Sequence, residues 1–554
     1  MHSNRGHTAG AMAVYQQPPL PSEDKRWRIV NGTMRRRCYS RSAPIETLHT
    51  VQSSFGFLDR DSIRFVAQAL WVPLSQAYGV ITFYHFFSMK PLGRHTCTLC
   101  TGTACFIKGS EKVLAAAEKQ MHVKVVETTQ DGNIWLIARI CGNCPVSDLI
   151  ASGKACGAIL AVEIPPADGK LRRLLNLAQA IQLHALSFFY LSCPDLLLGM
   201  DADKADRHIF SVGKAMPEVG RAGVQLRRFG QQIIEILGKK RIHPGWVVPG
   251  GVTKPLTVSK GDEILAMIPE SGASILLVLD AYKQVGNRFQ EEAAVFANFP
   301  SMFLGLVTPE GDLEFTDGAL RLIDATGDVV AEGMDAACFD REFGETVELF
   351  IFMKFPYCRT MGYPDGCYRV GSQARLNLVT HTGTPRADAE LRAFKALAEG
   401  PVPGSPYFHQ ARLIEILHGI EAIERILAEP DILDAHVRAT AGVNSLEGAG
   451  VAEAPRGTLV HHYKVDENGQ MLWANLAIAT GQNNNAMNRG ILQVAQHYVD
   501  GNRLTNGMLN RVEAVIRTFD PCLSCSTHAF GKMPLTVTLV DPEGNQLDER
   551  RRNG

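Results

Sequence analysis

The 554-residue chain lacks any run of about 18 apolar residues, the length that a membrane-spanning helix needs. The nearest candidate, residues 185–200, is interrupted by Ser192, Pro194 and Asp195. The first 21 residues contain no apolar core of the signal-peptide type. These absences predict a cytoplasmic protein without a transmembrane segment. In that compartment thiols stay reduced, so the 13 cysteines indicate metal ligands or buried thiols rather than disulfides.

An excess of charge of one sign is also lacking, because 56 Lys and Arg residues nearly balance 57 Asp and Glu residues. This balance does not favour nucleic acid or an anionic membrane as a partner. Apolar residues make up 45% of the chain, which is ordinary for a globular protein with a sizeable core. No fixed-period repeat and no convincing dinucleotide-binding glycine motif is found.

The pattern of apolar residues predicts a mostly α protein with a minor α+β part. Residues 1–25 are rich in Gly, Gln, Pro and His and predict a flexible tail. Residues 26–90 have helical spacing, and residues 91–138 read as a small β/α unit. After Cys144 long amphipathic helices dominate, and they are predicted over residues 170–191, 223–240 and 407–429.

Two Cys-x-x-Cys pairs stand far apart in the sequence, Cys141 with Cys144 and Cys522 with Cys525. Two intervening residues let both sulfur atoms of a pair turn toward one metal ion. Four thiolates suit zinc, an iron–sulfur cluster, or nickel with iron. Spacing alone makes a structural zinc site the commoner outcome, but zinc ribbons usually place their pairs close together. The long separation favours a site buried between elements from opposite ends of a large domain.

A third set of cysteines lies upstream, where Cys100 and Cys105 form a Cys-x4-Cys pair with Cys97 nearby. Two cysteines with this spacing are most simply ordinary thiols. The additional sulfur of Cys97 keeps a small cluster or a zinc site open as the alternative.

From Arg139 to the C-terminus the chain resembles the large subunit of NAD-reducing, bidirectional [NiFe] hydrogenases. The two cysteine motifs at opposite ends are highly specific together. The resemblance implies a large helical domain over residues 139–528 and a C-terminal extension, residues 529–554, which a maturation protease removes after nickel insertion. The segments that carry the resemblance are RICGNCPVSD, LAVEIPPADGKLRRLLNLAQAIQLHALSFF, KKRIHPGWVVPGGV, FPYCRTMGYPDGCYRVG, EAPRGTLVHHYKVDENG, ATGQNNNAMN and FDPCLSCSTHAFGKMPL.

Residues 26–138 resemble part of the thioredoxin-like [2Fe–2S] subunit of the same complexes and of respiratory complex I. The matching segments are MRRRCYS, LHTVQSSFGFL, VPLSQAYGVITFYHFFSMKPLGRHTC and CTGTACFIKGS. That family holds its cluster with a Cys-x4-Cys pair, here Cys100 and Cys105, and a later Cys-x3-Cys pair. The third cysteine position falls at Cys141, but the next cysteine is Cys144, a Cys-x2-Cys, and this pair is assigned to nickel because everything downstream matches the hydrogenase family. The remaining strands and helix of the [2Fe–2S] family are missing. An in-frame fusion near residues 138–139 is the simplest account, and an assembly error is the alternative. Cys100 and Cys105 are then half of a [2Fe–2S] site, which Cys97, an added ligand or a partner chain would complete.

The resemblance implies that Cys141 and Cys522 are terminal nickel ligands. Cys144 and Cys525 would bridge nickel to an iron that carries CO and cyanide. Soft thiolates stabilise nickel in changing oxidation states. Dihydrogen would split heterolytically, with a terminal thiolate, Cys522, taking the proton.

Three further residues gain roles from the resemblance. The guanidinium of Arg456 would lie over the metals, where it carries a permanent positive charge and cannot act as the base. Asp520 would orient the Arg456 side chain. His528 would bind a second Mg²⁺ or Fe ion. A structural ion-pair arginine is the alternative for Arg456, and a zinc ligand is the alternative for His528.

The chain departs from the hydrogenase pattern at three places. The family's Arg-x-Glu-Gly-His-like motif is missing ahead of the first cysteine pair. Asp148 stands where the family has a histidine that hydrogen-bonds a bridging sulfur, and Asn143 stands where an apolar residue is usual. An aspartate near thiolates is unfavourable in a low-dielectric site unless it is protonated or paired.

The predicted function is reversible dihydrogen oxidation and proton reduction, coupled to NAD⁺ or NADP⁺ through other subunits. The implied partners are a small iron–sulfur subunit, diaphorase subunits that bind NAD(P) and FMN, a maturation protease and nickel-insertion factors. One alternative is a non-catalytic electron-transfer or scaffold subunit of a hydrogenase–diaphorase complex. The other is a zinc-stabilised protein without redox function.

Overall fold

The computed structural model describes residues 18–37, 39–40, 43–83, 89, 143–203, 205–348, 353–467, 469, 471–499, 503–522, 535–540 and 546–552. These residues fall into two compact units, the first from residue 18 to 89 and the second from residue 143 to 552. The β/α unit predicted over residues 91–138 and most of the predicted tail lie outside the described residues.

The described part of the first unit is helical, as predicted for residues 26–90. Its helices are α1 (Arg26–Arg36), α2 (Pro44–Phe55), α3 (Arg60–Ala69) and α4 (Leu74–Phe83). Asp59 caps α3, because its carboxylate accepts a hydrogen bond from the Ser62 amide at 2.7 Å. The buried Trp27 ring packs against Phe55 and Phe65, with centroid distances of 4.6 and 5.3 Å.

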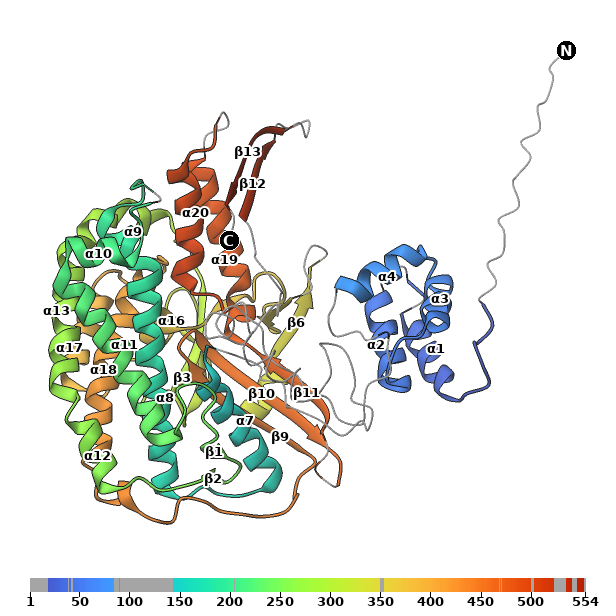
Figure 1. Cartoon of the computed structure of the whole chain (residues 1–554), viewed down its shortest axis with the longest axis horizontal. Helices are drawn as coiled ribbons and strands as arrows, with labels where there is room; N and C mark the ends of the chain where they lie inside the picture. Colours follow the sequence, from blue (N-terminus) through green and yellow to red (C-terminus); the bar gives the residue numbers. More distant parts are fainter. Residues whose placement is uncertain are drawn as a thin grey trace, which may run out of the picture. The chain divides into compact units, whose positions relative to one another are not determined.

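Long helices dominate the second unit, and α8, α11, α13 and α18 lie side by side within it (Figure 1). The helices are α7 (Pro145–Leu160), α8 (Pro166–Ala185), α9 (Cys193–Leu198), α10 (Ile209–Ala215), α11 (Pro217–Gly238), α12 (Val258–Leu265), α13 (Ile268–Gly286), α14 (Gln290–Val295), α15 (Phe339–Glu342), α16 (Ser372–Leu378), α17 (Pro385–Lys395), α18 (Tyr407–Leu427), α19 (Ala479–Tyr498) and α20 (Asn506–Phe519). A π-helical turn, Leu186–Ser192, continues α8.

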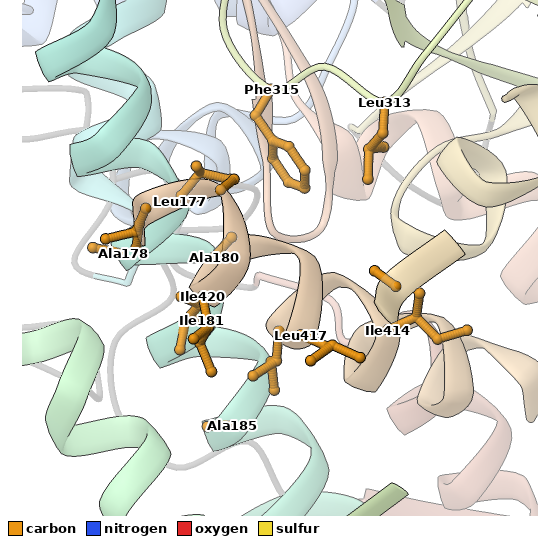
Figure 2. Packing of buried hydrophobic residues seen from close by; sticks show 14 of the residues in the cluster. Leu177, Ala178, Ala180, Ile181, Ala185, Leu313, Phe315, Ile414, Leu417 and Ile420 are labelled. Carbon is orange, nitrogen blue, oxygen red and sulfur yellow. The ribbon is translucent and has the colours of Figure 1, made fainter. Parts of the chain in front are cut away.

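The core of the second unit is built around α8, in which every residue from Leu174 to Ala185 is buried. Figure 2 shows side chains of α8, among them Leu177 and Ile181, facing Ile414, Leu417 and Ile420 of α18. Burial of this many aliphatic side chains is the main stabilising contribution to such a domain.

Two helical stretches of the second unit are long and apolar enough to cross a membrane by length and composition alone, Pro166–Leu198 and Val258–Gly286. The most apolar 18-residue window of the first is 83% buried inside the protein, and this stretch contains the central helix α8. The corresponding window of the second is 44% buried, and this stretch contains α13, which packs against α11 and α18. Packing within this core accounts for the apolar composition of the first stretch.

The strands of the second unit form small sheets. The sheet that bears on the site is antiparallel, in the order β11 (Met471–Ala477), β10 (Gly457–Val465), β9 (Glu447–Ala454). A second sheet has the order β5 (Val329–Met334), β4 (Ala319–Ile323), β3 (Met302–Val307), β8 (Tyr368–Arg369), with β3 and β8 parallel. Two-stranded pairs are β1 (Val247–Val248) with β2 (Gly251–Val252), β6 (Phe343–Val347) with β7 (Lys354–Cys358), and β12 (Leu535–Val540) with β13 (Gln546–Arg552).

Candidate metal centre

One cysteine from each predicted pair lies in the same buried cluster. Cys144 directly precedes α7, and Cys522 follows the end of α20. Both are 3% exposed, and they pack together with Leu183 of α8. The fold therefore brings the two distant cysteine motifs to one place, as their separation in the sequence predicted for a site between elements from opposite ends of a large domain.

The other predicted ligands, Cys141, Cys525 and His528, lie outside the described residues, as do Cys100 and Cys105. Within the part of the chain that the structure describes, no three His, Cys, Asp or Glu side chains form a group that could hold a metal ion. That part contains only two of the predicted ligands, Cys144 and Cys522.

Glycines in β9 bring the helix that follows Cys144 close to the strand that leads to Arg456. A Cβ atom on Gly450 would lie 2.2 Å from the carbonyl oxygen of Ala151, and one on Gly448 would lie 2.4 Å from that of Ala155. Any other residue at either position would push α7 away from β9.

Asn143 and Thr480 contact Cys522 directly. The Asn143 Nδ2 atom lies 4.0 Å from the Cys522 Sγ atom, as a donor to sulfur. The amide of Cys522 donates to Thr480 Oγ1, near the start of α19, at 2.9 Å. The asparagine that departs from the hydrogenase pattern thus links the first cysteine motif to the second.

Asp148, the other departure, lies between Cys144 and His461. The Cys144 Sγ atom donates to Asp148 Oδ2 at 3.7 Å, and Asp148 Oδ1 lies 3.4 Å from His461 Nε2. The other ring nitrogen of His461 is 2.7 Å from the Tyr463 hydroxyl, and burial raises the pKa of Tyr463 to about 12. His461 is therefore the side chain that faces Asp148 on the side away from Cys144. Nothing along the chain links His461 to Asp148, so this contact was not predictable from the sequence.

Arg456 and Asp520 form a buried ion pair beside Cys522. Arg456 lies in the tight connection between β9 and β10, where Ala454 pairs with Gly457. Its Nε donates to the Asp520 carbonyl oxygen at 2.7 Å, and its Nη2 donates to Asp520 Oδ1 at 3.2 Å. Asp520 has a left-handed backbone with φ 52°, which ends α20 and turns the chain toward Cys522.

A fully buried charge network that no sequence pattern indicated supports the Arg456 connection. Arg375 of α16 binds both carboxylate oxygens of Glu415 at 2.7 Å and one of Glu453 at 2.6 Å. It also donates to the carbonyl oxygens of Ala454 and Pro455, at 3.0 and 3.3 Å. The segment around Arg375 matches no catalytic motif, so no signal in the sequence identified it.

Burial and charge act against each other in this network. Burial alone would raise the pKa of the Glu415 carboxyl, but the Arg375 guanidinium lowers it to about 2. For Glu453 burial outweighs Arg375 and raises the pKa above its usual range. Glu415 Oε2 also contacts His184 Nε2 of α8 at 2.7 Å.

These residues fit a centre built on soft ligands. Two thiols from opposite ends of the domain share one buried cluster, and soft sulfur donors select nickel, iron or zinc over magnesium or calcium. A buried guanidinium is bound to Asp520, two residues before the second cysteine, and brings a permanent positive charge to this end of the site.

Comparison with known proteins covers both parts of the chain. Residues 30–150 match the thioredoxin-like [2Fe-2S] ferredoxin family, and residues 124–214 match the nickel-dependent hydrogenase family. The chain is 38% identical to the NAD-reducing hydrogenase HoxS subunit beta of Cupriavidus necator over 437 residues, 75% of this chain and 88% of that protein. It is 34% identical to one subunit of the vhc F420-non-reducing hydrogenase of Methanococcus voltae over 414 residues, 74% of this chain and 87% of that protein.

Solved structures agree with the predicted fold class. A crystal structure of an NAD⁺-reducing [NiFe]-hydrogenase in the H2-reduced state superimposes with a TM-score of 0.68 at 38% identity, covering 70% of this chain and 87% of that one. The Ni-Fe-Se hydrogenase from D. vulgaris Hildenborough shares the fold at 22% identity and a TM-score of 0.55, covering 70% of this chain and 87% of that one.

Proposed function

Since the chain belongs to the nickel-dependent hydrogenase family, as a large subunit, we propose that it splits dihydrogen heterolytically and reversibly at a nickel–iron centre held by Cys141, Cys144, Cys522 and Cys525. The observation that carries this assignment of ligands is the shared buried cluster of Cys144 and Cys522. His528 is assigned to a second Mg²⁺ or Fe ion.

A nickel–iron centre held by these four cysteines would supply Lewis acidity toward dihydrogen and redox capacity for its electrons. Cys522 is the base that takes the proton. Arg456 keeps its positive charge at any working pH, so it stabilises the thiolate form of Cys522 without competing for the proton. Asp520 holds Arg456 in place through two hydrogen bonds.

The protein works as one subunit of a larger assembly, as do the relatives that it matches. We propose that its partners are a small iron–sulfur subunit, which takes the electrons, and diaphorase subunits that bind FMN and NAD(P). A maturation protease and nickel-insertion factors would act on the chain before assembly. The proposed location is the cytoplasm.

The proposal includes a division of the chain into five parts. Residues 1–25 are a tail, residues 26–90 a helical segment of [2Fe–2S] subunit type, and residues 91–138 a truncated thioredoxin-like unit. Residues 139–528 are the hydrogenase domain, and residues 529–554 are the maturation extension. The match of residues 30–150 to one family and of residues 124–214 to another supports a change of character in this region. Cys100 and Cys105 would bind part of a [2Fe–2S] cluster.

An infrared spectrum of the protein purified with its partner subunits tests this function. Bands from iron-bound CO and cyanide are expected, together with nickel in metal analysis. A spectrum without these bands, from protein that contains zinc in place of nickel, would contradict the proposal.

A further inference from the structure

Two side-chain amides project from the apolar helix α8 toward the candidate metal centre. Gln179 and Asn176 lie one turn apart on the same face and are 1% and 0% exposed. A buried side-chain amide destabilises the folded protein unless it is hydrogen-bonded. The hydrogen-bond partners of Gln179 and Asn176 therefore show which parts of the site these two side chains hold in place. Neither residue belongs to a cysteine motif or to the Arg456–Asp520 pair.

Gln179 holds the backbone on both sides of Cys144. Its Oε1 accepts from the Val146 amide at 2.6 Å, and its Nε2 donates to the Asn143 carbonyl oxygen at 3.0 Å. A primary amide offers a donor and an acceptor at a fixed separation, so it fits one geometry of this loop. The two residues between the bonded positions are Cys144 and Pro145.

The same clamp acts on the second cysteine motif. Gln179 fixes the backbone of Asn143, and the side chain of Asn143 reaches the Cys522 sulfur. One chain of contacts between Cys144 and the Cys522 sulfur therefore runs through Gln179, on a helix packed in the core.

Asn176 extends the support to the Arg456 connection. Its Oδ1 accepts from the Ser147 hydroxyl at 2.8 Å, three residues after Cys144. Its Nδ2 donates to the carbonyl oxygens of Phe315 and Glu453, each at 2.9 Å. Glu453 is the residue from which the chain runs through Pro455 to Arg456.

We propose that Gln179 and Asn176 are positioning residues that set the Cys144 and Cys522 sulfurs and the Arg456 connection relative to one another. This inference rests on the proposed function, because the sulfurs need a fixed separation only if they share a metal centre. Residues that orient metal ligands without touching the metal commonly change metal affinity or activity by about 10–100-fold when they are removed.

The test compares Gln179→Leu with Gln182→Leu in the complex purified with its partner subunits. Gln182 lies one turn further along α8 and is 8% exposed, and within the described residues its Oε1 accepts no hydrogen bond. The measurements are the infrared bands of CO and cyanide, the nickel retained against a chelator, and the thermal midpoint. A Gln179→Leu protein with displaced bands and about 10–100-fold weaker nickel retention, beside wild-type values for Gln182→Leu, is the expected result.

Wild-type bands and wild-type nickel retention in Gln179→Leu would overturn the inference while leaving the proposed function intact. Wild-type protein without CO and cyanide bands would instead overturn the proposed function, and the inference with it. If Gln179→Leu does not fold, Gln179→Glu is measured, because it keeps the acceptor for Val146 and loses the donor to Asn143. Displaced bands in Gln179→Glu support the clamp, and unchanged bands contradict it.

Discussion

The two ends of the candidate metal centre are equally buried, but they are supported by different chemistry. At Cys144 the support consists of neutral amides from α8 and the Asp148–His461 pair. At Cys522 neutral contacts from Asn143 and Thr480 are joined by a charged group, the Arg456 guanidinium, which is bound to Asp520 two residues before the cysteine. A neutral support fixes a shape, whereas a permanent charge stabilises a charge that changes during the reaction. Changes near Cys144 should therefore alter metal binding, and changes at Arg456 should alter the rate with the metal retained.

The largest expected effect comes from removing a sulfur at either end. Cys144→Ser and Cys522→Ser should both abolish hydrogen-dependent dye reduction, because a hydroxyl is a poor ligand for a soft metal. Cys193→Ser is the control, since this buried cysteine lies in α9 and outside the cluster of Cys144 and Cys522. If either variant keeps more than about one tenth of the wild-type activity, the substituted cysteine is not a ligand of the metal centre.

Arg375→Met should destabilise the domain more than any other change to the support. It would leave Glu415 and Glu453 buried without their cation, and removing one partner of a buried ion pair costs about 3–5 kcal/mol. A urea denaturation midpoint measures this loss. Arg241→Met is the matched control, because Arg241 pairs with Glu235 on the surface and should shift the midpoint little. Equal midpoints for the two variants would contradict a structural role for the network.

Arg456→Lys separates charge from geometry at the Cys522 end. Lysine keeps the charge but loses the fork that binds Asp520 through two nitrogens, so the charge is no longer held in place. Activity is expected to fall by about 10²–10³-fold, the range found when one preorganised donor is removed from an active site. Nickel content should stay at the wild-type level. Loss of nickel in parallel with activity would show that Arg456 acts on metal binding, against the comparison drawn above.

Acid should remove the part of the network's stabilisation that comes from Glu415. The pKa of Glu415 is about 2 in the folded protein, against an ordinary value of 4.5, because Arg375 outweighs the effect of burial. As the pH falls, Glu415 is therefore protonated in the unfolded chain before it is protonated in the folded protein. The contribution of Glu415 to the free energy of unfolding is complete above pH 4.5 and is lost as the pH falls toward 2. Urea midpoints between pH 5 and 3 should fall in wild type, and this Glu415 contribution should be absent in Arg375→Met. Identical slopes in the two proteins would contradict the assignment.

The smallest expected effect is at the Cys144 end. Asp148→Asn keeps the shape of the side chain but removes the carboxylate that faces His461, so nickel retention against a chelator should weaken by about 10-fold. Asp340→Asn is the control, because Asp340 makes a similar contact with His462 nearer the surface. An Asp148→Asn protein whose nickel retention matches that of the control would show that Asp148 does not support the ligand.

The sequence was sufficient for much of the fold. The helix predicted over residues 407–429 is α18, Tyr407–Leu427, because its apolar residues recur at helical spacing. The helix predicted over residues 170–191 begins earlier, at Pro166, and changes to a π-helical turn from Leu186. The early start is explained by two consecutive prolines, which the first turn of a helix tolerates.

The candidate site was predictable only where residues share a motif. Spacing and resemblance led to Cys144, Cys522, Arg456 and Asp520, all of which the fold places close together. Gln179 was not predictable, because a glutamine in a helix shows nothing of the backbone that it will bind. Arg375, Glu415 and Glu453 come from three separate segments, and their mutual contacts exist only after the chain has folded.

The central claim is that sulfurs from the two cysteine motifs bind the same metal. Nickel-edge X-ray absorption of the purified complex tests it most directly, by comparing wild type with Cys144→Ser and Cys522→Ser. We predict a sulfur-dominated nickel environment in wild type and a loss of sulfur scattering, or of nickel itself, in each variant. A nickel spectrum that either substitution leaves unchanged would contradict a shared centre.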